Sequence, residues 1–229
     1  MKEADIEQNR QRPARAREAL PPVIYHMAEA VNWPSIERAG LLSTRALLEL
    51  AGVPEEERGQ MGCEQRTGPL LLPGGMVIRD QKPMPPAALE RCLHGMTPAQ
   101  WYELLNSQVF FWLDIERLNR MRMASKKQAQ IVMTIDTALL LSHHSERVSL
   151  APINTGNARR QPAQRGARTF VPYQQWLESG WASETGALGT SPRPRSHQPV
   201  ELTVTDAVRN ALDCMRAKHY LEPGELFQL

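Results

Sequence analysis

The chain has few cysteines, no long apolar run and almost no excess charge. Only three of its 229 residues are cysteines, and they are widely spaced, so we expect reduced thiols and a cytoplasmic location. The apolar runs are far shorter than the roughly 20 residues that a membrane helix needs, so we expect no membrane span. Lysine plus arginine number 27 against 25 acidic residues, so a basic surface for nucleic acid would have to be local.

Motifs for metals and for common nucleotide folds are also missing. No CxxC and no cysteine–histidine pair has zinc spacing. His143 and His144 are adjacent, and neighbours on a helix point about 100° apart, so we expect no metal site. Neither a Walker motif nor GxGxxG occurs, which excludes P-loop ATPase and Rossmann readings.

The length and composition predict one globular domain. Hydrophobic residues make up 41% of the chain and charged residues 23%, an ordinary globular mixture. We expect a flexible N-terminal arm over residues 1–20 and a single domain over residues 21–229. The arm has no apolar stretch, so we expect it not to be a secretory signal.

Local patterns predict a mixed set of helices and strands. Helix starts are expected at Asn32, Ser43, at Thr97 in a capping box, and at Asp114. Helices crowd the first half and strands the second, which favours an α+β fold. The expected strands cover residues 23–27, 108–113, 131–135, 147–150, 169–171 and 200–204.

Three stretches read as loops. Residues 54–86 are rich in proline, glycine and charge and predict a long loop with little regular structure. Residues 157–168 and 180–197 carry several arginines and predict flexible basic loops. Such loops are more often solvated surface than nucleic-acid contacts. Arg159 and Arg160 are the candidate exceptions, as contacts to DNA or RNA.

Four polar residues stand out from the core pattern. His26 interrupts an apolar strand, Arg66 and Arg79 lie in the long loop, and Glu201 lies in the last predicted strand. Each has a plain structural reading, because a strand histidine is more often a satisfied core residue and a strand glutamate usually faces solvent. Together they suit cleavage of the glycosidic bond of nicotinamide adenine dinucleotide (NAD).

This chemistry would give each group a role. A carboxylate such as Glu201 stabilises a ribosyl oxocarbenium ion or accepts a proton. An arginine pairs with the pyrophosphate, and His26 hydrogen-bonds the ribose. An aromatic ring such as Phe111 or Tyr102 stacks on the nicotinamide. Trp33, Phe110 and Trp112 are expected in the core.

The order of short motifs resembles that of DarT-type ADP-ribosyltransferases. The resemblance implies an ADP-ribosyltransferase-like fold of two small packed sheets, with helices concentrated in the first half. It further implies NAD as substrate, catalysis by Glu201 with Arg66 or Arg79, and a cofactor site that includes His26, Met27, Ser43 and Asn154. The motifs are IYHM at 24–27, WPSIERAGLLS at 33–43, EQR at 64–66, PGG at 73–75, VFFW at 109–112, IVMTID at 131–136, NTGNA at 154–158 and VEL at 200–202.

The chain over residues 23–206 more closely resembles a bacterial family of unknown function. Its marks are an IRDQ-P-M segment at residues 78–84 and an SPINSG-like segment at 151–156. Two features depart from DarT proteins: Glu116-Arg117-Leu118 stands where they carry Pro-Met, and residues 81–95 are an insertion.

We therefore expect an NAD-dependent ADP-ribosyltransferase acting on nucleic acid. Two alternatives stay open. RNA 2′-phosphotransferases share the fold and the early histidine. A non-catalytic module could retain the fold to bind a nucleotide or protein. The oligomeric state is not indicated by the sequence.

Overall fold

The computed structural model describes residues 20–81, 84–125, 127–157, 162–194 and 196–229. The predicted N-terminal arm lies outside these ranges except for Leu20, which is buried in the main core. Arg159 and Arg160 also lie outside them.

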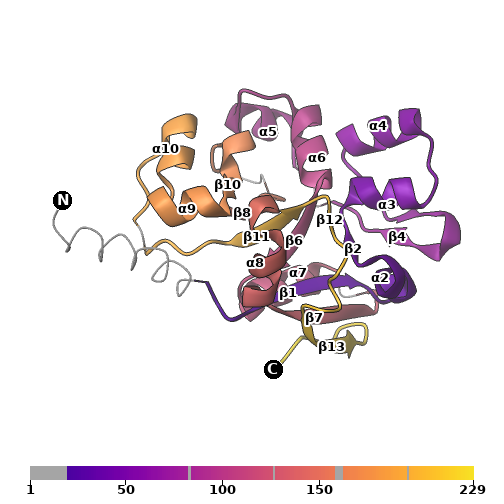
Figure 1. Ribbon diagram of the computed structural model, residues 1–229. Coiled ribbons are helices and arrows are strands. Elements are labelled where there is room, and N and C mark those ends of the chain that lie inside the picture. The colour runs from indigo at the N-terminus through magenta and orange to yellow at the C-terminus, as the bar shows by residue number, and fades with distance from the viewer. Residues whose placement is uncertain (1–19, 82–83, 126, 158–161, 195) are drawn as a thin grey trace.

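An antiparallel sheet of seven strands, in the order β10-β8-β11-β6-β1-β7-β13, forms the centre of the molecule (Figure 1). Five of the strands overlap predicted ones closely, and β10 overlaps the predicted 169–171. β13 was missed, because its alternating side chains are largely exposed along an edge. The strands are β1 Val23–Glu29, β6 Gln108–Trp112, β7 Gln130–Asp136, β8 Val148–Ala151, β10 Val171–Pro172, β11 Glu201–Thr205 and β13 Met215–Leu221.

The sheet is almost divided in two between β1 and β6. Strand β1 pairs with β7 over seven residues, and β6 pairs with β11 over five. Tyr25 opposite Trp112 is the one pair of described residues that joins β1 to β6. Beyond it the strands diverge, so two wings of three and four strands meet at a vertex. The expectation of two small packed sheets is met in part, because the two wings belong to one continuous sheet.

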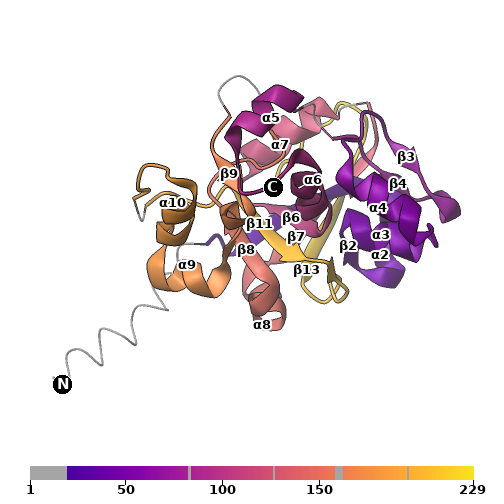
Figure 2. The same ribbon diagram turned by 90° about the horizontal axis from the view of Figure 1, so that it is seen from above.

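Helices lie around this sheet and along the whole chain. Helices α2 to α4 lie at one end of the molecule and α9 and α10 at the other (Figures 1 and 2). Helices α7 to α10 fall in the second half, which corrects the expectation that helices concentrate in the first. The helices are α2 Trp33–Ala39, α3 Thr44–Leu50, α4 Glu55–Cys63, α5 Pro86–Cys92, α6 Pro98–Asn106, α7 Ile115–Ala124, α8 Thr137–His144, α9 Tyr173–Ser179 and α10 Ala182–Leu188.

Short elements complete the described chain. Within the described ranges, no helix is long and apolar enough to cross a membrane. Three two-stranded pairs stand apart from the large sheet. They are β2 Leu41–Leu42 with β12 Ala207–Val208, β3 Leu70–Leu71 with β4 Val77–Ile78, and β5 Leu93–His94 with β9 Arg165–Gly166, and the 3₁₀ turns are η1 Ala30–Asn32, η2 Pro73–Gly75, η3 Ser145–Arg147 and η4 Ala167–Thr169.

Most predicted helix starts are confirmed by their caps. The side chains of Ser43, Thr97 and Asp114 each accept a hydrogen bond from a backbone N–H in the first turn, and Thr97 forms the full capping box. Asn32 precedes α2 but makes no side-chain cap. The predicted loop over 54–86 contains α4, favoured by three glutamates in its first turn, and the β3–β4 pair.

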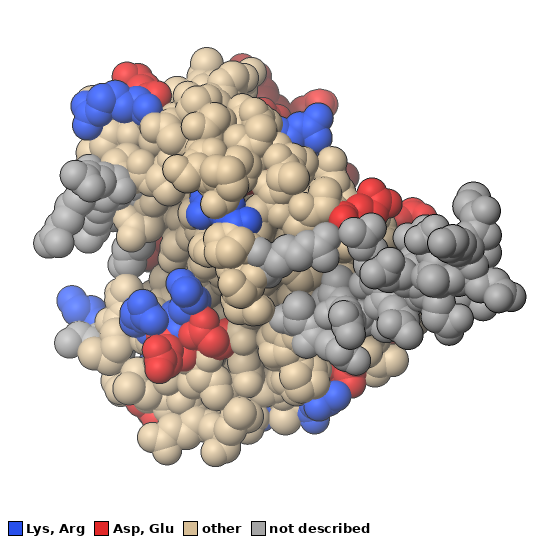
Figure 3. All heavy atoms as spheres, turned by 90° about the vertical axis from the view of Figure 1, so that its left-hand side faces the viewer, with Lys and Arg blue, Asp and Glu red and all other residues tan. Residues whose placement is uncertain are grey.

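The two predicted basic loops contain ordered structure instead. Arg165 lies in β9 and is 1% exposed. Arg193 makes two hydrogen bonds of 3.0 and 3.1 Å to the carboxylate of Glu184, which is fully buried in α10. Among the described residues on the face shown in Figure 3, Lys and Arg lie in small separate groups, some of them beside Asp and Glu. Arg165 and Arg193 therefore make contacts within the fold.

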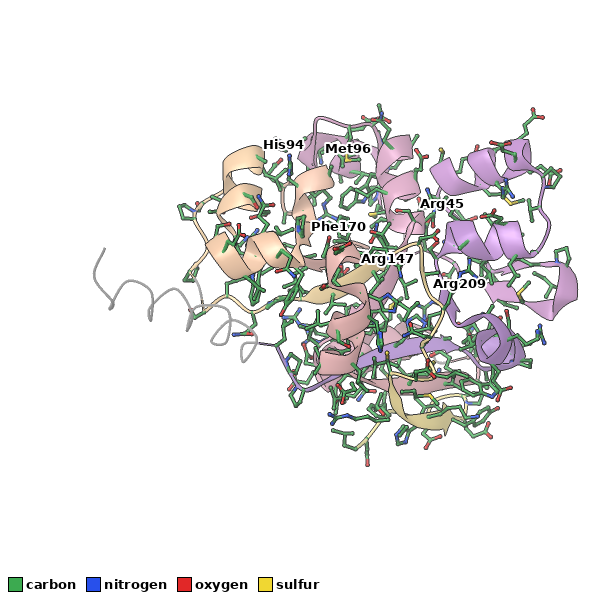
Figure 4. All side chains as sticks on the ribbon, viewed as in Figure 1. Arg45, His94, Met96, Arg147, Phe170 and Arg209 are labelled. Carbon is green, nitrogen blue, oxygen red and sulfur yellow. The ribbon has the colours of Figure 1, made fainter. Side chains whose placement is uncertain are left out.

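The turn between β11 and β12 contacts two segments that are distant from it in sequence. Arg147 donates to the carbonyl oxygens of Thr205 and Ala207, and Arg45 lies 3.4 Å from Asp206; Figure 4 labels both arginines. Asp206 has a φ of 72°, the one positive value among described residues other than glycine. Its carbonyl oxygen accepts from the backbone N–H of Ser43, which fixes the start of α3.

Candidate active site

A cleft of about 770 Å³ opens where β1 and β6 diverge. That volume is in the range of small-molecule sites, roughly 300 to 1,000 Å³. Its walls are residues 26–29 of β1, most of β6, one face of α7, the segment 77–81 and the turn 154–157, with Glu201 at the side of β11. The described part of this lining carries four arginines: Arg66, Arg79, Arg117 and Arg120.

His26 stands at the vertex of the cleft. Its Nδ1 lies 2.9 Å from the carbonyl oxygen of Phe110, across the gap where the two strands separate. A carbonyl only accepts, so Nδ1 carries the proton. The pKa of His26 is lowered to about 4, mainly by burial and also by the charge of Arg79. The hydrogen bond to Phe110 acts in the opposite direction and raises it. The ring is therefore neutral at pH 7, with Nε2 as a hydrogen-bond acceptor.

Glu201 is a buried carboxyl, with 3% of its surface exposed. Its Oε2 accepts from the Thr155 hydroxyl at 2.7 Å and from the Thr155 backbone N–H at 3.2 Å. Burial raises the pKa of Glu201 to about 7, although the Thr155 hydrogen bonds and the charges of Arg165 and Arg117 lower it. Both protonation states are thus populated at neutral pH, as acid–base chemistry requires.

This burial corrects the expectation that Glu201 lies on a solvent face. Strand β11 is paired on both sides, with β6 and with β8, and its first four residues are buried. Alternation along the strand correctly places Glu201 opposite to Leu202. It does not reveal that the Thr155 turn closes over the carboxyl.

Arg66 and Arg79 both lie in the cleft, so the two candidates for the functional arginine are neighbours. Arg66 donates from Nη1 to Asn106 Oδ1 at 2.9 Å and from Nε to the carbonyl oxygen of Arg79 at 3.3 Å. Arg79 reaches Ser125 Oγ at 3.4 Å. Burial lowers the pKa of Arg66 to about 10, which leaves the guanidinium charged. Both arginines line the cleft, where cationic side chains suit an anionic ligand, although the charge of Asp80 acts on both and that of Glu29 acts on Arg79.

Two asparagines hold these arginines in place. Asn106 also accepts from Gln81 and donates to the carbonyl oxygen of Gly62, so it joins both ends of the loop to α6. Asn32 clamps β4: its Nδ2 donates to the Val77 carbonyl at 2.8 Å, and its Oδ1 accepts from the Val77 N–H at 2.7 Å. The clamp explains why Asn32 does not cap α2.

The opposite wall is one face of α7. Residues 117, 120, 121 and 124 line the cleft and follow helical spacing, while Leu118 and Arg122 point into the interior. Arg117 pairs with Asp114 at 2.8 Å, and its charge acts on Glu201. The charge of Arg117 on this wall therefore favours the ionised form of the carboxyl.

Six of the nine described candidates from the sequence line the cleft, and three do not. Ser43 is 1% exposed and caps α3, although its neighbours Leu42 and Thr44 reach the cleft. Tyr102 and Phe111 lie in core clusters. The candidates that line the cleft are His26, Met27, Arg66, Arg79, Asn154 and Glu201.

The side chains of strand β6 do not face the cleft in the way that was expected. Phe111 is fully buried on the face of Leu202, and its ring lies 5.6 Å from that of His26 without reaching the lining. Phe110 and Trp112, expected in the core, are partly buried against core clusters and also line the cleft. Side chains alternate between the two faces of a strand. When three consecutive residues are aromatic, the sequence does not show which of them face the core.

Several site residues gave no clear signal in the sequence. Thr155 adjoins the candidate Asn154, which was a usable hint. Glu29 ends β1 and is 7% exposed, with its Oε1 accepting from Gln130 at 3.0 Å. Asn32 and Asn106 act through long-range hydrogen bonds that no local pattern encodes.

Comparison with solved structures gives one distant likeness. The chain is similar to Thermosipho africanus DarTG in complex with ADP-ribose, with 11% identity and a TM-score of 0.38. The match covers 88% of this chain and 44% of that one, so this chain spans less than half of that protein's length. No curated protein matches it in sequence.

The family comparison covers most of the chain. The model of the Family of unknown function (DUF7002) matches residues 22–215, a range that begins just before β1 and ends where β13 starts. All the described cleft residues fall inside this range. The chain belongs to the family DUF7002.

Proposed function

We propose that the protein binds NAD in the cleft between β1 and β6 and transfers its ADP-ribosyl group to an acceptor. The observation that carries this proposal is the buried Glu201 carboxyl, with a pKa of about 7, at the side of a cleft that also holds charged arginines. A cleft of this size fits a dinucleotide, and the order of the sequence motifs supports the same reading.

Each group has a chemical role in this proposal. Arg66 and Arg79 bind the diphosphate from the cleft wall, because guanidinium groups match phosphate oxygens. The neutral His26 accepts a hydrogen bond from a ribose hydroxyl. Trp112, opposite Glu201 in the sheet, supplies the aromatic wall that was expected from Phe111.

Glu201 acts at the reacting sugar. The bond from ribose C1′ to the nicotinamide nitrogen breaks, and its electron pair leaves with nicotinamide. The ionised carboxylate stabilises the oxocarbenium ion. The acceptor atom then bonds to C1′, and its proton passes to Glu201.

We propose a nucleic acid as the acceptor. Arg120 lies on the cleft face of α7 with 69% of its side chain exposed, and Arg117 lies one turn before it. Exposed arginines beside the reacting group suit a phosphate backbone. The expected contacts Arg159 and Arg160 follow Asn157 of the cleft in sequence and remain part of this proposal.

The test is a thermal-shift titration with NAD, combined with a nicotinamide-release assay with and without DNA or RNA oligonucleotides. NAD at about 100 times its dissociation constant adds roughly 2.7 kcal/mol, or about 5 to 10 °C in a chain of this length. Wild type and Glu201→Gln should both shift, whereas His26→Ala should not, each measured against its own unliganded melting temperature. His143→Ala, an exposed histidine outside the described lining, is the control.

The outcomes separate the candidate functions. Nicotinamide release that is lost in Glu201→Gln supports a transferase. Binding without release, with or without oligonucleotides, would leave a nucleotide-binding module. Absence of any shift up to millimolar NAD would refute the proposal.

A further inference from the structure

Arg165 is a cation buried behind the candidate site. Its side chain is among the largest fully buried ones, at 1% exposure. Arginine does not lose its proton in proteins, and a buried charge is strongly unfavourable without partners. The fold must therefore supply groups that compensate it.

The partners of Arg165 come from four segments. Its Nη1 donates to the Thr155 carbonyl oxygen and its Nε to that of Ala163, both at 3.1 Å. The guanidinium carbon lies 5.8 Å from the centre of the Trp101 ring. The Cys92 thiol is a further hydrogen-bond partner, and its own pKa is raised by burial, so it is neutral.

Glu201 is the carboxyl group that acts on this cation. Burial lowers the pKa of Arg165, and the charge of Glu201 opposes that effect. Within the described part of the chain, Arg165 makes no direct ion pair. The two groups are instead connected through Thr155.

Thr155 joins the two at both of its ends. Its carbonyl oxygen accepts from Arg165, while its N–H and hydroxyl both donate to Glu201 Oε2. The residue is 1% exposed, so solvent does not compete for these bonds. The position of the turn, and with it the orientation of the carboxyl, depends on where Arg165 holds the Thr155 carbonyl.

A close backbone approach fixes Arg165 itself. In the parallel β5–β9 pair, Arg165 lies opposite Leu93 and Gly166 opposite His94, which Figure 4 labels. A Cβ at position 166 would lie 2.6 Å from the His94 carbonyl oxygen. Gly166 therefore allows the pairing that places the guanidinium under the turn.

We propose that Arg165 is a positioning residue for Glu201, acting through Thr155 on the orientation and ionisation of the carboxyl. It is a buried part of the site that the sequence pattern assigned to a surface loop. The inference rests on the proposed function for its catalytic meaning, but the link from Arg165 to Glu201 can be measured without NAD.

The experiment is a ¹³C NMR titration of the glutamate side-chain carboxyls from pH 5 to 9. The Glu201 signal is assigned by its loss in Glu201→Gln. Removing the cation in Arg165→Met, or the hydroxyl in Thr155→Val, removes an interaction that favours the carboxylate. The titration midpoint should therefore move upward from about 7 in both variants.

Conservative and control variants make the test specific. Thr155→Ser keeps the hydroxyl and should restore the wild-type midpoint, and Arg165→Lys should give a smaller shift than Arg165→Met. Arg193→Met removes another largely buried arginine, paired with Glu184, and should leave the Glu201 midpoint unchanged. Near-UV circular dichroism shows which variants are folded.

Unchanged midpoints in folded Arg165→Met and Thr155→Val would overturn the proposal. If Arg165→Met does not fold, unchanged midpoints in Arg165→Lys and Thr155→Val overturn it. Because this readout needs no NAD, a failure here is distinct from a failure of the proposed transferase activity.

Discussion

Replacing Glu201 by glutamine should change how the stability of the protein depends on pH. The pKa of Glu201 rises from 4.5 to about 7 on folding, because burial disfavours the charged form. Ionisation therefore favours the unfolded chain. The contribution of the neutral carboxyl to stability is full below pH 4.5 and is lost as the pH rises through about 7.

The size of the effect follows from that difference in pKa. Each pKa unit corresponds to about 1.4 kcal/mol, so complete ionisation lowers the free energy of unfolding by about 3 kcal/mol. Most of this, about 2 to 3 kcal/mol, falls between pH 5 and pH 8. Glutamine cannot ionise. The free energy of unfolding of Glu201→Gln, relative to that of wild type, should therefore increase by about 2 to 3 kcal/mol between pH 5 and pH 8.

Urea unfolding of both proteins at pH 5, 6, 7 and 8 measures the effect. The amide nitrogen of glutamine lacks an assured acceptor in the buried site and lowers stability, but by the same amount at each pH. The difference between the two proteins isolates the Glu201 carboxyl. Glu116→Gln is the control, because that side chain is 88% exposed on α7 and should show a nearly constant difference.

A constant difference between Glu201→Gln and wild type from pH 5 to 8 would refute the reasoning. It would mean that the carboxyl has an ordinary pKa in the folded protein. Glu201 would then be ionised throughout this range, and it would be a much weaker base than a carboxylate with a pKa of about 7.

Two further predictions concern the frame of the site. Asn32→Ala removes the two hydrogen bonds to β4 and should lower stability by about 2 kcal/mol and weaken NAD binding. The control Asn119→Ala removes an equivalent pair of hydrogen bonds, to Phe227 in the C-terminal segment. It should lower stability by a similar amount but leave the affinity for NAD unchanged. Equal NAD affinities in the two variants would contradict a role of Asn32 in holding the cleft wall. Gly40→Ala should lower the free energy of unfolding by about 3 kcal/mol or more, because φ is +75° and the new Cβ would lie 2.4 Å from the Val208 carbonyl oxygen. Gly59→Ala in α4 has open space and should be neutral or stabilising, so similar melting temperatures for these two variants would be the contrary result.

Local signals in the sequence were enough for most strands of the large sheet, for three capped helix starts and for several residues of the cleft. Ser43, Thr97 and Asp114 mark helix starts by capping, which depends on residues three apart in the chain. His26 stood out because its polar ring interrupts the apolar run of residues 23–27. The arginine pair was found because Arg66 and Arg79 lie in one loop.

The sequence by itself thus determined the mixed fold, its main strands and the choice of His26, Arg66, Arg79 and Glu201 as candidates, all of which line the cleft. Only the tertiary structure decided that Glu201 is buried, because its desolvation comes from Thr155, 46 residues away. The phase of β6, the α7 wall and the burial of Arg165 were likewise decided by packing between distant segments. Local propensity acts within a few residues, whereas the pKa and orientation of a catalytic group depend on whatever the fold places around it.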